Sequence, residues 1–279
     1  MTEPLPADVQ REIARALGVA PVPDPATEAE RRVEFLAEQV RTSGARSLVL
    51  GISGGVDSTT AGRLCQLAVE RLRAEGRQVT FTAMRLPYGV QADEADAQLA
   101  LGFIRADEVL TVDVKPATDG ALAALKAAGL TYTDRGHEDF VGGNVKARQR
   151  MVAQYAAAGA KGGLVVGTDH AAEAAVGFFT KFGDGAADVM PLSGLTKRQV
   201  RAIAEALGAP AELVKKVPTA DLEDLAPGRP DEDALGVGYD ELDDFLEGLP
   251  VSEDVFRTVL GHYRRTEHKR NLPVVPPVA

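Results

Sequence analysis

The fold is decided by a stretch at residues 47–60, which reads Ser-Leu-Val-Leu-Gly-Ile-Ser-Gly-Gly-Val-Asp-Ser-Thr-Thr. Its first half is a short apolar run from Leu48 to Ile52, which is typical of a strand buried on both faces. Apolar residues then recur at helical spacing from Ala61 to Leu72. A glycine-rich turn at residues 53–58 therefore joins a central strand to a helix.

This turn has the composition of a phosphate-binding loop. Glycine lets the backbone approach a ligand closely, and the free N–H groups and dipole at the start of a helix favour an anion. No Lys follows the glycines as in a Walker A loop, and the spacing differs from the GxGxxG dinucleotide motif. Asp57 stands in the turn instead, which suits a divalent cation placed between its carboxylate and the phosphates. The alternative is an ordinary strand-to-helix turn in which Ser or Asp caps the helix.

The rest of the chain alternates strands with helices. Three more short strands are predicted at residues 78–83, 108–112 and 164–166. The alternation predicts an α/β fold with a doubly wound, Rossmann-like parallel sheet flanked by helices. We expect a single domain over residues 1–279, with an N-terminal helical arm (about 1–44), a core (about 45–210) and a C-terminal loop and helices (about 211–279). Residues 130–143 and 218–232 are predicted to be loops, either mobile lids or plain surface loops.

The bulk composition limits the function. The chain has 45% hydrophobic and 26% charged residues, which is ordinary for a globular protein. Its net charge of −10 argues against nucleic acid as a partner. The single cysteine, Cys65, excludes an intrachain disulfide and a cysteine-based zinc site, and its place on an apolar helix face favours burial over a reactive thiol. No signal peptide or membrane-spanning run is found, so we expect no membrane partner and a cytoplasmic location.

The turn at residues 53–58 resembles the SGGxDS loop of the N-type ATP pyrophosphatases, which split ATP between the α and β phosphates. Three further segments narrow the choice within that superfamily: Gly-Asn-Val-Lys-Ala-Arg-Gln-Arg-Met at 143–151, Gly-Thr-Asp-His-Ala-Ala-Glu-Ala at 167–174, and Thr-Glu-His-Lys-Arg at 266–270. Together with the turn they closely resemble the ammonia-dependent NAD synthetases over nearly all of residues 30–272. The resemblance implies an adenine nucleotide alpha hydrolase-like fold and the conversion of deamido-NAD to NAD by way of an acyl-adenylate.

That reaction places demands on the site. A carboxylate is a poor electrophile until one of its oxygens becomes part of a leaving group, so adenylation must come first. Pyrophosphate needs N–H donors and a metal, and two anionic substrates need cations between them. Ammonium must lose a proton before it attacks.

The resemblance implies an ATP site and a Mg²⁺ site. The ATP-binding candidates are Gly51, Ile52, Ser53, Gly54, Gly55, Val56, Asp57, Ser58, Arg85, Gln91, Thr168, Lys197 and Thr219. Asp57 and Glu173 would bind Mg²⁺, and with Asp184 they are the catalytic candidates. Taken alone, Glu173 fits a solvated helix face and Thr219 a turn residue. Lys197 at a helix start opposes the helix dipole, which supports a functional role.

The deamido-NAD candidates are Phe140, Asn144, Arg148, Lys181, Asp188, His268 and Lys269. In the family, the segment with His268 and Lys269 reaches the partner's dinucleotide across a homodimer, although basic residues at a helix end also complement the dipole. Asp184 is the candidate for positioning or deprotonating ammonium, and a turn aspartate is the alternative. We expect His170 only to pack or to form a hydrogen bond near a strand end.

The chain lacks the glutaminase domain, and the Cys nucleophile, of glutamine-dependent NAD synthetases, so free ammonia is the predicted nitrogen donor. A GMP-synthetase-like amidating enzyme is the nearest alternative. A tRNA thiolase would need paired cysteines and a basic surface. A nucleotide sensor without turnover is the non-enzymatic alternative, against which the two metal candidates Asp57 and Glu173 argue.

Overall fold

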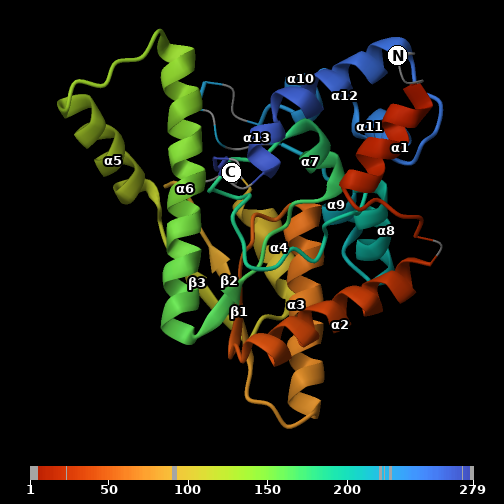
Figure 1. Cartoon of the computed structure of the whole chain (residues 1–279). Helices are drawn as coiled ribbons and strands as arrows, with labels where there is room; N and C mark the ends of the chain where they lie inside the picture. Colours follow the sequence, from red (N-terminus) through yellow and green to blue (C-terminus); the bar gives the residue numbers. More distant parts are fainter. Residues whose placement is uncertain are drawn as a thin grey trace.

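A four-stranded parallel sheet lies at the centre of the computed structural model, which describes residues 6–22, 24–89, 93–219, 222, 224–225, 228–271 and 273–276. Its strands are β1 (Ser47–Gly51), β2 (Thr80–Arg85), β3 (Glu108–Thr111) and β4 (Gly163–Val165), in the order β3-β2-β1-β4 (Figure 1). The predicted α/β fold with a parallel sheet is confirmed, and each predicted strand lies within two residues of the observed one.

The strand order creates a topological switch point. The chain runs from β1 to β2 to β3 and then returns past β1 to form β4 on its other side. Connections from neighbouring strands therefore leave in opposite directions between β1 and β4. In open α/β sheets this is where a crevice forms at the carboxyl ends of the strands.

Helices cover both faces of the sheet (Figure 1). On one face, α2 (Pro25–Ser43), α3 (Val56–Ala74), α4 (Glu94–Ile104) and α8 (Lys197–Ala206) enclose the largest apolar core with Leu48 and Leu50. On the other face, α6 (Arg135–Lys161) packs against Val49 and Val165, and α5 (Lys115–Ala127) packs against α6. Because side chains alternate along a strand, β1 contributes to both cores.

The prediction of a loop over residues 130–143 is wrong for most of its length, because α6 already begins at Arg135. The side chain of Asp134 caps the helix by accepting a hydrogen bond from the N–H of His137 at 2.8 Å. Gly142 and Gly143 look like turn residues in the sequence, but they lie within the helix and are buried. A side chain at Gly143 would come within 3.1 Å of the Leu222 carbonyl, so glycine here serves close packing.

The C-terminal part builds a second apolar core. It combines α7 (Ala171–Val176), α11 (Tyr239–Leu246) and α12 (Glu253–Arg265) with the N-terminal α1 (Pro6–Ala16). The predicted N-terminal arm is thus divided, because α1 joins this second core whereas α2 packs on α3. Three short helices complete the chain: α9 (Ala211–Val214), α10 (Asp231–Leu235) and α13 (Glu267–Arg270). Within the described residues, no helix has both the length and the apolar character needed to cross a membrane.

Candidate active site

A cavity of about 490 Å³ opens at the carboxyl ends of β1 and β4, at the switch point, and falls in the size range of small-molecule sites. The predicted site residues that line it are Gly51, Ile52, Ser53, Gly55, Val56, Asp57, Ser58, Arg85, Phe140, Asn144, Thr168, Glu173, Asp184, Lys197, Thr219 and Lys269. The fold therefore brings together most of the residues that the motifs predict. Gln91 lies outside the described residues.

The glycine-rich turn forms one wall of the cavity. Gly55 is the N-cap of α3, and no side chain caps its first turn. Ser53 and Ser58 are joined by their hydroxyl oxygens at 3.0 Å, and the Ser58 hydroxyl also accepts a hydrogen bond from the N–H of Ser53 at 3.3 Å. The turn is thus held in shape by its own serines, and the start of a 19-residue helix faces the cavity.

Gly54 lies on the side of the turn that faces α4 and does not line the cavity. Its φ of 88° lies in the left-handed region that favours glycine. A Cβ atom at this position would lie 2.7 Å from the backbone nitrogen of Ala97 in α4. Both the dihedral and the close approach therefore require glycine.

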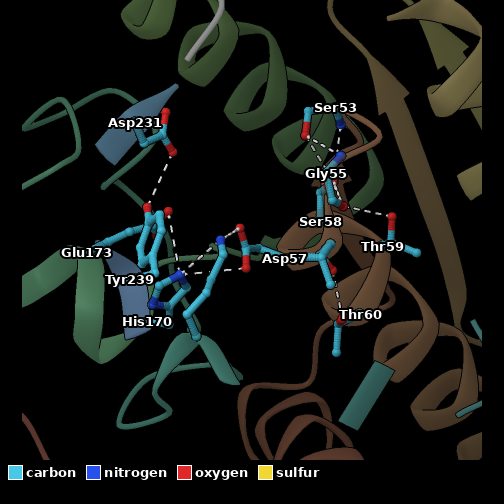
Figure 2. A network of polar contacts seen from close by, with 12 residues as sticks. Ser53, Gly55, Asp57, Ser58, Thr59, Thr60, His170, Glu173, Asp231 and Tyr239 are labelled. Carbon is cyan, nitrogen blue, oxygen red and sulfur yellow. Dashed lines mark hydrogen bonds and ion pairs between the residues drawn. The ribbon is translucent and has the colours of Figure 1, made fainter. Parts of the chain in front are cut away.

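Charged side chains from three segments meet beside the turn (Figure 2). The Lys197 ammonium donates to Oδ2 of Asp57 at 2.7 Å. The imidazole Nε2 of His170 lies 3.6 Å from Oδ1 of Asp57 and 3.6 Å from Oε1 of Glu173. Asp57 lies in the first turn of α3, His170 and Glu173 follow β4, and Lys197 starts α8, so three segments far apart in sequence converge on one point.

Burial sets the charge states of this group. Burial alone would raise the pKa of the Asp57 carboxyl, but the nearby positive charges, first among them Lys197, together with the hydrogen bond from Lys197 hold that pKa below its usual value. Burial, and then the charge of Asp57, raise the pKa of Glu173 well above its usual range. Burial lowers the pKa of His170 to about 3, so its ring is neutral at pH 7. The cluster therefore pairs the Asp57 carboxylate with Lys197, whereas the surroundings of Glu173 favour its protonated form unless a cation lies beside it.

The ligand atoms of this cluster are arranged in a way that suits a small divalent cation. Ligand atoms of Asp57, His170 and Glu173 all lie within 4.8 Å of one another. Lys197 uses Oδ2 of Asp57, whereas Oδ1 is buried and has no hydrogen-bond partner among the described residues. A buried carboxylate oxygen without a donor is costly unless a cation contacts it. Carboxylate oxygens are also the ligands that Mg²⁺ prefers.

Lys197 can stay at a helix start because anions surround it. Thr196 caps α8, with Gln199 completing a capping box. Asp243 of α11 accepts hydrogen bonds from the backbone N–H groups of Lys197 and Arg198 at 2.9 and 2.7 Å. These acceptors satisfy the helix end, and Asp57 pairs with the ammonium, so the unfavourable dipole is offset.

Arg85, which the resemblance assigns to the adenine-nucleotide site, is buried beside the turn. Its guanidinium is hydrogen-bonded to the carbonyl of Ile52 and, at 2.8 Å, to the Glu94 carboxylate. Asp184 lies across the cavity, where its Oδ1 accepts a hydrogen bond from the N–H of Thr180 at 2.9 Å. Burial raises the pKa of Asp184 above its usual value.

Four of the predicted dinucleotide residues lie outside the cavity lining: Arg148, Lys181, Asp188 and His268. Three of them form one exterior group, in which Arg148 donates to the Lys181 carbonyl at 3.3 Å and the Lys181 ammonium contacts the His268 carbonyl. Asp188 instead accepts a hydrogen bond from the N–H of Val165 at 2.7 Å and so holds the end of β4. Their contact with a dinucleotide stays a prediction.

The comparisons with known proteins agree with this geometry. The NAD synthase family model matches residues 28–273. The chain belongs to the NAD synthase family. One relative, the NH(3)-dependent NAD(+) synthetase of Streptomyces coelicolor, is 69% identical over 276 residues, which cover 99% of this chain and 100% of the relative. The family predicted from the sequence is therefore confirmed.

Solved structures of the NAD synthase family share the fold. The crystal structure of NAD+ synthetase from Burkholderia pseudomallei is 61% identical, with a TM-score of 0.85, covering 98% of this chain and 100% of that one. The structure of NMN synthetase from Francisella tularensis is 33% identical, with a TM-score of 0.79, covering 91% of this chain and 99% of that one.

Several residues of this NAD synthase site were not predicted from the sequence. His170 lies between the two carboxylates and is more central than the expected packing role. Gln154 of α6 accepts a hydrogen bond from the N–H of Gly51 at 2.8 Å, and the hydroxyl of Tyr239 donates to Asp231 at 3.3 Å. The presence of His170 inside the 167–174 motif was a usable signal. Gln154 and Tyr239 stand in ordinary amphipathic helices, and nothing local marks them.

Proposed function

We propose that this chain catalyses the ATP-dependent amidation of deamido-NAD with ammonia, which yields NAD, AMP and pyrophosphate. The observation that carries the proposal is the meeting of Asp57, Lys197 and Glu173 beside a glycine-rich helix start at the sheet's switch point. ATP use follows from the family. The wider family also supports the choice of substrate, because relatives named for this reaction match nearly the whole chain.

The reaction has two steps, adenylation of the substrate carboxylate and its amidation. The substrate carboxylate attacks the α-phosphorus of ATP, the bond to the bridging oxygen breaks, and pyrophosphate leaves. Ammonia then attacks the carbonyl carbon of the acyl-adenylate and AMP leaves with the bonding electrons. We assign the first step to the turn, where Ser53, Gly55 and Ser58 would hold the pyrophosphate.

Lys197 would steady the negative charge of the triphosphate, because it is buried, charged and already at the cavity wall. Thr168, Thr219 and Arg85 line the same cavity and would contact the rest of ATP. Asp57 and Glu173 would hold Mg²⁺, which when bound offsets charge on the phosphates. Asp184 would orient ammonium and accept its proton, since it faces the cavity with a raised pKa.

The dinucleotide would enter along α6, where Phe140 and Asn144 line the cavity together with Lys269. The exterior group of Arg148, Lys181 and His268 would then serve the dinucleotide of a second copy, so we propose a homodimer. We also propose a cytoplasmic location, because ATP is the co-substrate.

The test follows NAD and pyrophosphate together after mixing the protein with deamido-NAD, MgATP and ammonium. Equal amounts of the two products are expected. Asp57→Asn should lower the rate by about 100-fold or more, in line with the loss of an electrostatic group at a reacting centre. The matched control is Asp254→Asn at the exposed start of α12, which should keep full activity.

Two further arms separate the alternatives. Glutamine in place of ammonium should give almost no NAD, and equal use of both would defeat the proposed nitrogen donor. The corresponding mononucleotide should be tested beside deamido-NAD, because a 33% identical structure is that of an NMN synthetase. A higher kcat/KM for the mononucleotide would overturn the dinucleotide assignment while leaving the chemistry intact.

A further inference from the structure

Tyr239 is a buried residue that contacts the charged cluster from the second apolar core. It begins α11 and has 1% of its surface exposed. Its ring centroid lies 4.9 Å from the Lys197 ammonium, within the range of a cation–π interaction. The same ring lies 6.3 Å from the His170 ring. Tyr239 therefore faces two members of the cluster without lining the cavity.

The other end of Tyr239 points toward a cavity loop. Its hydroxyl donates to Oδ2 of Asp231 at 3.3 Å, as Figure 2 shows. Asp231 lines the cavity, and its N–H donates to the Pro218 carbonyl at 3.1 Å. A bridge between Thr219 and Pro230 closes the base of the same loop. One side chain thus connects the base of this loop to the Lys197 ammonium.

Lys197 has few other restraints on its ammonium. It is 1% exposed, and among the described residues its ammonium is ion-paired with Oδ2 of Asp57 at 2.7 Å. Nε2 of His170 also lies 3.5 Å from the ammonium. A flexible four-carbon chain needs a third contact to fix its end in one place.

We infer that Tyr239 is a positioning residue, whose ring holds the Lys197 ammonium against Asp57 and whose hydroxyl ties this arrangement to the backbone contact between Asp231 and Pro218. The inference rests on the proposed function for its kinetic consequences. The ring and the hydroxyl have separate tasks. Loss of the ring releases Lys197 and lowers kcat for adenylation, whereas loss of the hydroxyl frees Asp231 from Tyr239 at the cavity wall and raises KM for ATP.

Three variants separate these tasks. Tyr239→Phe removes the hydroxyl and keeps the ring, and Tyr239→Leu removes both. Phe245→Leu is the matched control, because Phe245 lies in the same helix and the same apolar core, is fully buried, and packs its ring on Phe256 at 5.8 Å. It reproduces the packing loss of Tyr239→Leu without touching Lys197.

The kinetic readout is pyrophosphate release from MgATP and deamido-NAD. Tyr239→Leu should lower kcat about tenfold, which corresponds to a cation–π contact of ~1.4 kcal/mol. Tyr239→Phe should keep kcat within about twofold and raise KM for ATP about threefold, as expected for one hydrogen bond. Phe245→Leu should match Tyr239→Leu in its thermal midpoint and keep the wild-type kcat.

A second readout does not depend on turnover. In protein labelled with ¹³C-lysine, the Cε protons of Lys197 should be shifted upfield by the Tyr239 ring, and Lys197→Arg identifies their signal by its absence. Tyr239→Phe should keep the shift, and Tyr239→Leu should lose it. If Lys197 shows no such shift, or if Tyr239→Leu is no slower than Phe245→Leu, the inference is wrong. If the shift is present but the wild-type protein releases no pyrophosphate, the proposed function fails and the positioning of Lys197 stands.

Discussion

The Glu173 carboxyl lies in surroundings that disfavour its ionised form. Burial and the nearby Asp57 raise its pKa well above the usual 4.5. A group whose pKa is raised on folding contributes stability below its unfolded pKa, and that contribution is lost as the pH rises through the folded pKa. Ionised Glu173 therefore destabilises the fold at neutral pH, which fits a residue kept for a cation.

This predicts an unusual result for Glu173→Gln. After treatment with a chelator, the variant should unfold at a higher temperature than the wild type at pH 8, and the difference should vanish near pH 4.5. Added Mg²⁺ should stabilise the wild type and not the variant, because a ligand that binds only the folded state raises its stability. Thermal unfolding measured across this pH range, with and without Mg²⁺, provides the test.

The control for this experiment is Glu253→Gln, at the exposed start of α12, which should change stability by less than about 0.5 kcal/mol at any pH. If Glu173→Gln is less stable than the wild type at pH 8 without metal, the charge of Glu173 is already balanced by the protein.

For single residues, the sequence predicted which side chains belong to the site better than it predicted which groups they contact. Asp57 and Glu173 follow different strands, so the edge at which they meet could be predicted from the parallel sheet. The short contact between Lys197 and Asp57 could not, because it joins residues 140 positions apart. The central place of His170 was missed for the same reason, because it depends on the two carboxylates that the fold brings to either side of the ring.

At the scale of single elements, the turn before α3 depends on where α4 is packed. Gly54 has a φ of 88°, and an added Cβ would lie 2.7 Å from a backbone nitrogen of α4. Backbone cannot move aside as a flexible side chain can. Gly54→Ala should therefore lower the free energy of unfolding by about 1–3 kcal/mol.

The neighbouring glycine offers a matched comparison. Gly55 has a φ of −79°, and its added Cβ would find only the Ser53 hydroxyl, at 3.5 Å. Gly55→Ala should change the unfolding free energy by less than about 1 kcal/mol. Denaturant unfolding of both variants gives the two values, and equal losses would show that α4 does not constrain the turn.

The short apolar runs of the four strands were predicted to within two residues of the observed strands. The start of α6 was missed because Gly142 and Gly143 are typical of turns. Packing against Leu222, 79 positions further along, explains why glycines stand inside this helix. Local propensity was overridden there by a tertiary contact.

At the scale of the whole molecule, the cavity is closed by a contact between the core and the C-terminal part. Lys146 of α6 is buried, and its ammonium donates to the Leu222 carbonyl at 3.0 Å and to Asp224 at 2.6 Å. Asp139, two turns earlier on the same face of α6, accepts hydrogen bonds from the N–H groups of Asp224 and Leu225, both at 2.8 Å. These partners are 76 to 86 positions apart, so no local pattern could have predicted them.

The contact of Lys146 with Leu222 and Asp224 leads to a last prediction. Lys146→Met should free the segment around Leu222 and raise KM for ATP about tenfold, because the lost hydrogen bonds are charge-assisted and worth ~1.4 kcal/mol or more. The value of kcat should stay near that of the wild type, since Lys146 does not line the cavity. Limited proteolysis should cut the variant faster between residues 217 and 230. Lys126→Met, which removes an exposed ion pair with Glu138 and a contact with the Tyr132 ring, both away from the cavity lining, should change neither KM nor cleavage. If Lys146→Met lowers kcat and leaves KM unchanged, Lys146 acts on the reacting groups and not on closure of the cavity.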